Sequence, residues 1–219
     1  MYPTIDDQYQ KLNADDKKIY DKLLFSESIE GWLLLSEIVE LYHLITMTTR
    51  RPAVFVEIGT WMGKSASIMG KAALDRGDAV VYGIDPFTGI GDPVSEKEYQ
   101  KQRNQLNRTQ QEECEHNLQQ AGVQSAVRLL PFTSTNAKKY FLESKIDGLF
   151  IDGNHEFQHV MNDIELWSPL LVSGGWLVLH DVEAIHVDGP KRAMKELQRD
   201  TQHWNNWCIF GEMSVCRRR

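Results

Sequence analysis

IDGLFIDGNHEFQHVMNDIELWSPLLVSGGWLVLHD, residues 146–181, holds two short apolar runs on either side of an amphipathic segment. The runs at 146–152 and 174–181 have the length and composition of buried strands. Between them, EFQHVMNDIELWSPLL has the apolar spacing of a helix. A strand, a helix and a second strand in this order predict a parallel sheet that is covered by helices.

The same alternation extends from this stretch toward both ends of the chain. Further strands are predicted by PAVFVEIG (52–59), AVVYGID (79–85), AVRLLPF (126–132) and WCIFGEMSVCR (207–217), the last as two short strands about a Gly211-Glu212 turn. We therefore expect an α/β fold with a seven-stranded, mostly parallel sheet and an antiparallel strand near one edge. Residues 1–50 have helical patterns and are expected to form an N-terminal helical extension of a main domain at 51–219.

Two segments are expected to shape a substrate site rather than the sheet. Residues 29–47 (IEGWLLLSEIVELYHLITM) predict an amphipathic helix with Trp32 on its apolar face. Residues 88–121 begin with a loop, TGIGDPVS, and continue as a very polar, helix-like stretch. A solvated helix accounts for most of the charge of that stretch.

Composition and charge exclude several classes of function. The net charge is -7 and the pI is near 5.5, so the chain has no general attraction for nucleic acid or for an anionic membrane. No apolar run approaches the ~18 residues that would suggest a membrane span, and the N-terminus lacks a signal-peptide pattern. The three cysteines have no metal-ligand spacing and fit a reducing compartment. We expect a cytoplasmic protein that binds neither nucleic acid nor membrane; a homodimer stays open.

Two strand ends carry residues suited to a nucleotide-like ligand. VEIGTWMGKS, residues 56–65, places Glu57 before a glycine turn, and glycine there lets a ligand approach the backbone closely. The turn is neither GxGxxG nor GxxxxGK[ST]. Asp85 ends the next strand, where an acid can accept hydrogen bonds from ribose hydroxyls. An Asp-Pro turn is the alternative explanation of Asp85.

With these two features, the sequence resembles class I S-adenosylmethionine-dependent methyltransferases. The resemblance is closest to the branch related to metal-dependent macrolide-sugar O-methyltransferases and cephalosporin hydroxylase-like proteins, and it covers roughly Glu30 to Cys216. It implies a Rossmann-like fold and S-adenosylmethionine as cofactor. The cofactor contacts that it implies are Glu57, Gly59, Thr60, Gly63, Ser65, Asp85, Phe132, Thr133 and Asp152, with Ser134 as an alternative to Thr133.

Asp152 and Asp181 end two strands that the resemblance places side by side. Neighbouring strands are about 4.8 Å apart, and two carboxylates so close repel each other unless a proton or a cation neutralises them. A divalent ion, Mg²⁺ first, is the natural solution. Either residue could instead cap the helix that follows it.

Two histidines complete this candidate centre. The metal-dependent relatives imply that His155, three residues after Asp152, is the general base, because a hydroxyl must lose its proton as it attacks a sulfonium methyl. They have an acidic pair where this chain has His180 and Asp181. Histidine at position 180 favours Mn²⁺, Fe²⁺ or Zn²⁺; it also leaves open a site held by the aspartates alone, or no metal.

The sequence thus predicts metal-assisted methylation of a small-molecule hydroxyl, on a natural-product or sugar-like acceptor. A cephalosporin hydroxylase-like enzyme component is one alternative. A non-catalytic S-adenosylmethionine-binding partner or regulator is another. A nicotinamide dehydrogenase is disfavoured because GxGxxG is missing.

Overall fold

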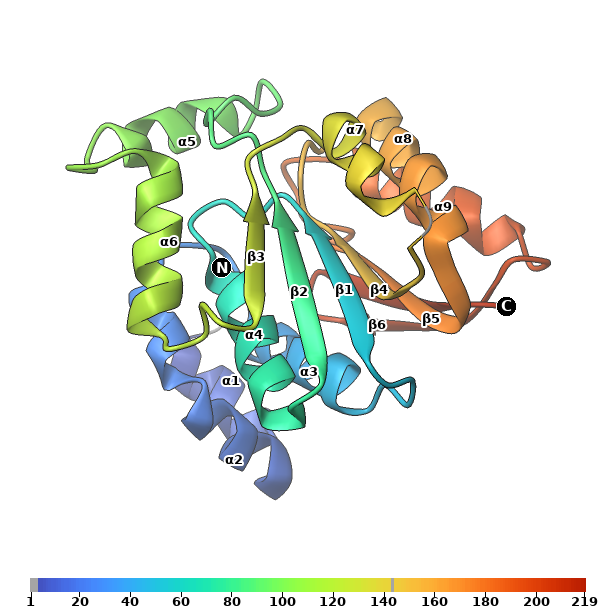
Figure 1. The fold of residues 1–219 in the computed structure, drawn as a ribbon, viewed down its shortest axis with the longest axis horizontal. Helices are drawn as coiled ribbons and strands as arrows, with labels where there is room; N and C mark the ends of the chain where they lie inside the picture. Colours follow the sequence, from blue (N-terminus) through green and yellow to red (C-terminus); the bar gives the residue numbers. More distant parts are fainter. Residues whose placement is uncertain (1–3, 143) are drawn as a thin grey trace.

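The central element of the fold is a seven-stranded mixed sheet (Figure 1), seen in a computed structural model that describes residues 4–142 and 144–219. The strand order is β3-β2-β1-β4-β5-β7-β6. β7 runs antiparallel to both of its neighbours, and the other neighbouring pairs are parallel. The predicted fold class is therefore confirmed. The strands are β1 (Ala53–Ile58), β2 (Ala79–Ile84), β3 (Val127–Leu130), β4 (Ile146–Ile151), β5 (Leu171–Leu179), β6 (Trp204–Phe210) and β7 (Met213–Arg218).

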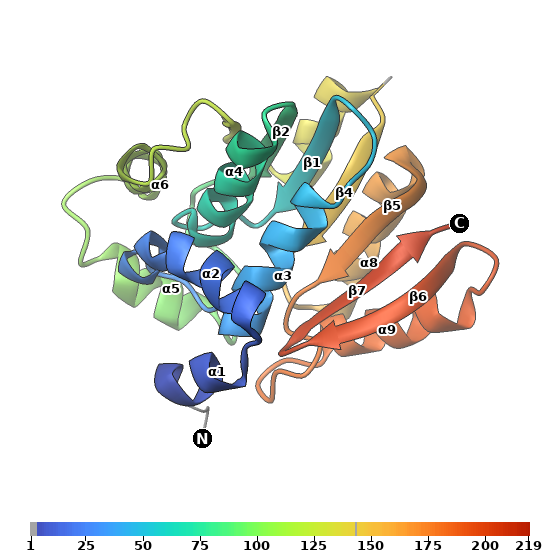
Figure 2. The same ribbon diagram turned by 90° about the horizontal axis from the view of Figure 1, so that it is seen from below.

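Helices cover both faces of the sheet (Figures 1 and 2). One face carries α1 (Ile5–Lys11), α2 (Ala14–Lys22), α3 (Leu35–Thr46), α4 (Lys64–Arg76) and α6 (Gln110–Gln120); the other carries α7 (Ser134–Ala137), α8 (Phe157–Trp167) and α9 (Gly189–Arg199). Two separate apolar cores result, because side chains alternate between the faces of a strand. Phe55 and Trp176 belong to the core under α3 and α4, whereas Val56 and Leu177 belong to the core under α8 and α9.

The stretch 146–181 folds as its pattern predicts. β4 is buried along its whole length, and it pairs in parallel with β5 after the crossover through α8. Gly148 lies opposite Trp176, and a Cβ at Gly148 would come within 2.4 Å of that indole ring. The glycine therefore makes room for the largest side chain at the centre of the sheet.

The N-terminal part departs from the sequence prediction at one point. α3 begins at Leu35, so the predicted helix over 29–47 lacks its first six residues. The Glu37 carboxylate accepts a hydrogen bond from the Leu34 backbone N–H at 2.7 Å and so fixes the start of the helix. Trp32 consequently lies outside the helix, and its side chain is 51% exposed instead of packed on a helical face. The side chains of α2 and α3 pack in the same core as β1, and the boundary drawn at residue 50 stays a prediction.

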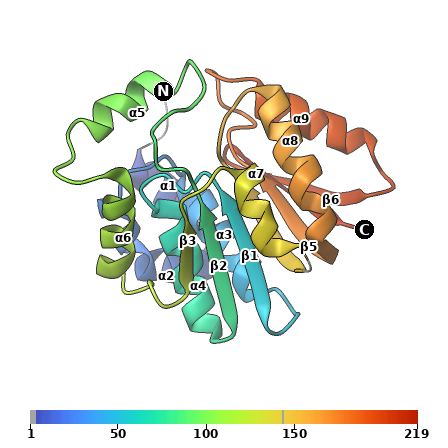
Figure 3. The ribbon, with the colours of Figure 1, turned by 45° about the horizontal axis from the view of Figure 1, so that its top comes forward.

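Residues 88–121 form two helices rather than one. α5 (Glu96–Arg103) and α6 are separated by a short loop, and the Thr109 hydroxyl accepts a hydrogen bond from the Glu112 backbone N–H to start α6. Figure 3 shows α5 beyond the carboxyl ends of the parallel strands, across from α8 and α9. None of the helices in the described part of the chain combines the length and the apolarity that a bilayer crossing requires.

Candidate active site

The carboxyl ends of β1, β4 and β5 open into a cavity of about 690 Å³. The loops that follow these strands are held side by side by backbone hydrogen bonds from Gly59 to Ile84, from Asp152 to Ile58 and from His180 to Ile151. A smaller hollow of about 190 Å³ lies next to the cavity and shares Gly59 and Asp152 with it. One continuous space thus runs from the glycine turn to the end of β5.

The glycine turn after β1 is pressed against the loop after β4. Gly59 has a φ of 88°, and a Cβ there would lie 2.0 Å from the Asp152 backbone oxygen. Gly63 also has a φ of 88° and precedes α4, where a Cβ would meet the Cys114 sulfur at 3.0 Å. Glycine is needed at the first position both for its backbone conformation and for the close approach of the two loops.

Glu57 is a fully buried carboxyl group directly below this turn. Burial raises the pKa of Glu57 to about 8, although a hydrogen bond from the Ser65 hydroxyl opposes the shift. The other Glu57 oxygen, Oε2, and the buried hydroxyl of Thr60 have no hydrogen-bond partner. Unpaired buried polar atoms are uncommon. Thr60 lines the cavity and Glu57 lies behind this lining, so the turn fits a ligand that carries a cation and hydrogen-bond donors.

Asp85 connects the glycine turn to the adjacent hollow. Its two carboxylate oxygens accept hydrogen bonds from the backbone N–H groups of Trp61, at 2.9 Å, and Phe87, at 2.6 Å. Both donors have positive φ values, 50° and 52°, which are uncommon for residues with a side chain. Asp85 and Thr133 line the smaller hollow, whereas Phe132 does not and packs instead at 5.4 Å from the ring of Tyr140. Contact of Phe132 with an adenine ring stays a prediction.

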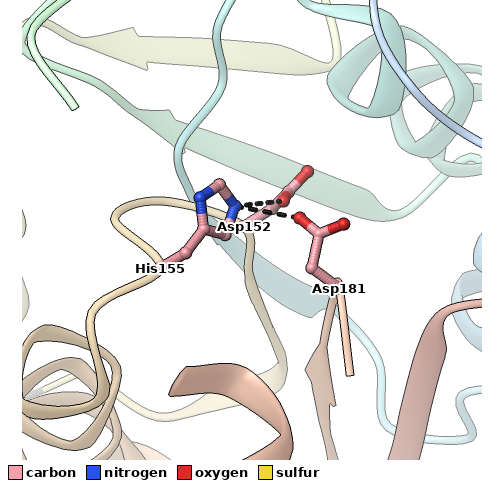
Figure 4. A group of neighbouring side chains, drawn as sticks. All are labelled: Asp152, His155 and Asp181. Atoms are coloured by element: carbon pink, nitrogen blue, oxygen red, sulfur yellow. Dashed lines mark ion pairs between the residues drawn. The ribbon is translucent and has the colours of Figure 1, made fainter. Parts of the chain in front are cut away.

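Asp152, His155 and Asp181 converge on the floor of the cavity (Figure 4). The His155 Nε2 atom lies 2.9 Å from an Asp181 oxygen and 4.0 Å from an Asp152 oxygen. One donor atom from each of the three residues lies within 4.8 Å of the others, close enough to bind one metal ion together. The expected approach of the two aspartates is therefore present, and a divalent cation is chemically suited to this set of oxygen and nitrogen donors.

His180 lies on the buried side of the same cluster. Its Nδ1 atom is 3.2 Å from an Asp152 oxygen and 3.3 Å from an Asp181 oxygen. Asp181, the next residue, has a φ of 58°, so the backbone bends sharply at the point where β5 ends. The departure from an acidic pair at this position has thus placed an imidazole nitrogen against both aspartates.

The carboxylates of this cluster raise the pKa values of both histidines. Burial lowers the pKa of His155, but Asp152, Asp181 and Asp92 outweigh that effect and raise the pKa to about 12. Burial also lowers the pKa of His180. The neighbouring carboxylates outweigh burial and raise this pKa well above its usual range. His155 Nε2 and His180 Nδ1 are nevertheless buried without an aligned hydrogen bond. The positive charges of the two imidazoles therefore compensate the aspartates, and a metal ion bound by a histidine nitrogen would have to displace its proton.

Two residues of the site were missed in the sequence. Asp92 is buried, and its Oδ2 lies 2.7 Å from His155 Nδ1, while its Oδ1 accepts hydrogen bonds from the backbone N–H groups of Val94 and Ser95. Glu37 in α3 lies 3.3 Å from His180 Nε2. Asp92 follows Gly91 in a polar loop and Glu37 looks like an ordinary surface acid of an amphipathic helix, so local patterns gave no signal for either.

Comparison with known proteins identifies the family of this chain. The family described as methyltransferase domain matches residues 56–182, which contain the glycine turn and all three residues of Figure 4. This chain belongs to that family. The resemblance to class I S-adenosylmethionine-dependent methyltransferases is thereby confirmed. An uncharacterized protein of Acanthamoeba polyphaga mimivirus is 30% identical over 135 residues, which are 59% of this chain and 51% of the viral protein. The chain spans about half the length of that curated relative.

Solved structures support the fold of this methyltransferase. The O-methyltransferase NovP has a TM-score of 0.67 at 19% identity, and the match covers 84% of this chain and 80% of NovP. TomG, an O-methyltransferase from Streptomyces achromogenes that is involved in tomaymycin synthesis and was solved with S-adenosylmethionine, has a TM-score of 0.62 at 15% identity and covers 95% and 91%. At these identities the likeness concerns the fold.

Proposed function

We propose that this methyltransferase transfers the methyl group of S-adenosylmethionine to a hydroxyl oxygen of a small molecule, assisted by a divalent cation. The observation that carries the proposal is that the glycine turn after β1 and the Asp152–His155–Asp181 cluster line one cavity of about 690 Å³. A methyl donor bound at the turn and an acceptor bound at the cluster would then meet inside the same space.

The cofactor would occupy both hollows. Its methionine part would lie along the turn at Gly59, where Glu57 Oε2 and the Thr60 hydroxyl are available to its ammonium group. Its nucleoside would extend into the 190 Å³ hollow between Asp85 and Thr133. The positive end of α4, which begins just after Gly63, would face the carboxylate.

Asp152, Asp181 and His180 would hold the cation. When bound, a divalent cation would lower the pKa of an acceptor hydroxyl and orient its oxygen. It would also neutralise Asp152 and Asp181, two of the three aspartates that raise the pKa of His155 to about 12. This matters because an imidazole that is already protonated at neutral pH cannot accept a proton. The proposed base role of His155 therefore depends on the proposed metal.

His155 is suited to be the general base because Asp92 fixes one of its nitrogens, Nδ1, and leaves Nε2 facing the cluster. In the transfer, the acceptor oxygen forms a bond to the methyl carbon while the carbon–sulfur bond breaks and its electron pair stays on sulfur. The hydroxyl proton passes to His155 Nε2. The products are a methyl ether, S-adenosylhomocysteine and a protonated histidine, so atoms and charges balance.

The acceptor would bind between residues 30–34 and α5, as the sequence suggested. Here the cavity wall combines apolar and aromatic side chains with the carboxylates of Glu30 and Glu98. The Tyr99 ring lies 4.6 Å from the ring of Trp61 and 6.0 Å from that of Trp32. The described lining contains six carboxylates, one lysine and no arginine. Such a wall favours an acceptor with an apolar or aromatic ring face and disfavours phosphate, coenzyme A or carboxylate groups. A natural product or a deoxygenated sugar fits this description.

Calorimetry with S-adenosylmethionine tests the cofactor, and absence of binding would refute the core of the proposal. Methyl transfer is then measured on a panel of hydroxylated ring compounds of equal size that are cationic, neutral or anionic. We expect turnover of neutral and cationic members, loss of turnover in EDTA and recovery with Mg²⁺ or Mn²⁺. Binding without transfer to any member of the panel would instead favour a non-catalytic partner or regulator.

A further inference from the structure

Glu37 is a buried acid that the proposed reaction does not use directly. It lies in the first turn of α3, is 1% exposed and lines the floor of the cavity beside His180. A buried ionised carboxylate loses its hydration, so a native structure keeps one only where partners compensate for that loss. The partners of Glu37 therefore indicate its role.

Three groups approach the Glu37 carboxylate from three parts of the chain. Oε1 accepts a hydrogen bond from the Glu212 backbone N–H, at 2.6 Å, in the turn between β6 and β7. Oε2 accepts one from the Leu34 backbone N–H, at 2.7 Å, and lies 3.3 Å from His180 Nε2. The turn packs tightly here, since a Cβ on Gly211 would come within 2.6 Å of Oε1. Two backbone donors thus hold the carboxylate in place, and the imidazole of His180 is the one side chain among these contacts.

This contact determines which nitrogen of His180 faces the aspartates. Because a carboxylate only accepts hydrogen bonds, Nε2 must carry the proton that is shared with Glu37. Nδ1 is then the nitrogen left to face Asp152 and Asp181, at 3.2 and 3.3 Å. Histidines that bind metals are generally oriented by such a second hydrogen bond, which sets both the tautomer and the ring plane.

We propose that Glu37 is the positioning residue that makes His180 a metal ligand through Nδ1, so that the Glu37–His180 pair replaces an acid at this position of the centre. The inference rests on the metal-assisted part of the proposed function. It also assigns a role to the N-terminal helix, because the carboxylate comes from 143 residues away in the sequence. A glutamate that served only to start α3 would not need to be buried against an imidazole.

The test is a double-mutant cycle on Mn²⁺ affinity, measured by electron paramagnetic resonance without acceptor. Glu37→Gln keeps one side-chain oxygen but loses the carboxylate charge, and we expect the Kd for Mn²⁺ to rise about 10- to 100-fold. His180→Asp restores an acid, which Glu37 would then repel. In that background Glu37→Gln should leave the Kd unchanged or lower it, so its effect should vanish or reverse sign.

A purely structural role predicts a different pattern. Glu37→Gln would then lower the melting temperature but leave the Kd of the folded protein unchanged, or change it equally in both backgrounds, and either result would overturn the inference. Absence of Mn²⁺ binding to the wild-type chain would refute both the metal and this inference. Equal binding by wild type and Glu37→Gln would refute the inference alone.

A second measurement needs no variant, in case Glu37→Gln does not fold. Wild-type protein labelled with ¹⁵N-histidine and loaded with Zn²⁺ reports the tautomer of each ring through long-range proton–nitrogen correlations. We expect His180 to carry its proton on Nε2 and to bind the metal through Nδ1. Binding through Nε2, or a His180 ring unaffected by Zn²⁺, would contradict the proposal.

Discussion

The two halves of the cavity are built in different ways. On the cofactor side, Glu57, Gly59 and Asp85 come from two neighbouring strand ends, and the hydrogen bond that links the two loops, from the Trp61 N–H to Asp85, spans 24 positions. On the other side, His155 and His180 face residues 63 and 143 positions away, Asp92 and Glu37. The cofactor half is thus a local structure of consecutive loops, whereas the catalytic half depends on buried charges that are brought together by the whole fold.

Gly59→Ala should have the largest effect, because Gly59 joins the two halves. An alanine Cβ would overlap the Asp152 backbone oxygen, 2.0 Å away, so either the turn or the loop that carries Asp152 must move. We expect loss of S-adenosylmethionine binding in calorimetry together with loss of methyl transfer.

Gly77→Ala is the matched control for that variant. Gly77 has a φ of 83°, close to that of Gly59, but a Cβ there would meet no atom within 4 Å. It should therefore show only the backbone strain of about 1–2 kcal/mol and retain binding and activity. If both variants bind S-adenosylmethionine equally well and have equal activity, the contact between the two loops is not required for cofactor binding or methyl transfer.

Substitutions of His155 and of its partners should impair the catalytic half of the cavity and leave the cofactor half intact. His155→Ala should reduce kcat by about 10²- to 10⁴-fold, the usual contribution of a general base, with little change in the Kd for S-adenosylmethionine. Asp92→Asn keeps the oxygen that accepts the hydrogen bonds of the Val94 and Ser95 N–H groups but loses the carboxylate that faces His155 Nδ1, and a loss of about 10- to 100-fold in kcat is expected. Ser95→Ala removes a weaker 3.3 Å contact to the same nitrogen and should cost less. If Asp92→Asn has the kcat of the wild type, Asp92 does not support the base role of His155.

The difference between the halves also explains what could be predicted from the sequence. The glycine turn, Asp85 and Asp152 follow apolar runs directly, so the rule that ligands bind at the carboxyl ends of parallel strands was sufficient to find them. For His155 and Asp181 the family resemblance was needed as well, because it placed their two strands side by side and implied a base three residues after Asp152. Sequence patterns do not predict tertiary contacts. No periodicity shows that Glu37 faces inward in an otherwise ordinary helix, or that the loop before α5 turns Asp92 toward His155.

Trp32 illustrates the same limit at the level of one element. Its spacing from Leu35 and Ile38 suited a helical face, and that prediction was wrong because the Glu37 carboxylate starts the helix three residues later than Trp32. A capping interaction therefore outweighed apolar periodicity and freed the indole for the cavity wall.

Glu57 allows a test of the cofactor half that depends on pH. Its folded-state pKa of about 8 exceeds the ordinary value of 4.5, so the folded protein holds an extra proton between these pH values. The corresponding stability is fully present below pH 4.5 and is lost as the pH rises through about 8. Thermal unfolding should show a steeper decline of Tm between pH 5 and 8, as an approximate window, for wild type than for Glu57→Gln.

Cofactor binding should be linked to the same proton. A cationic ligand favours the ionised carboxyl group, so S-adenosylmethionine should release up to one proton at neutral pH. Calorimetry in two buffers with different ionisation enthalpies measures this release, and Glu57→Gln should abolish it. Release that persists in the variant would assign the proton to another group.

Trp32→Ala should have the smallest effect and should separate acceptor binding from cofactor binding. The indole is 51% exposed, lines the cavity and lies 6.0 Å from the Tyr99 ring, so it can contact an acceptor without supporting the core. An aromatic contact contributes about 0.5–1.5 kcal/mol, which corresponds to a KM for the acceptor that is roughly 2- to 12-fold higher. Trp207→Ala is the control, because Trp207 packs on the core under α8 and α9. A change in the Kd for S-adenosylmethionine with an unchanged acceptor KM would place Trp32 in the cofactor half, and the division of the cavity would then have to be redrawn.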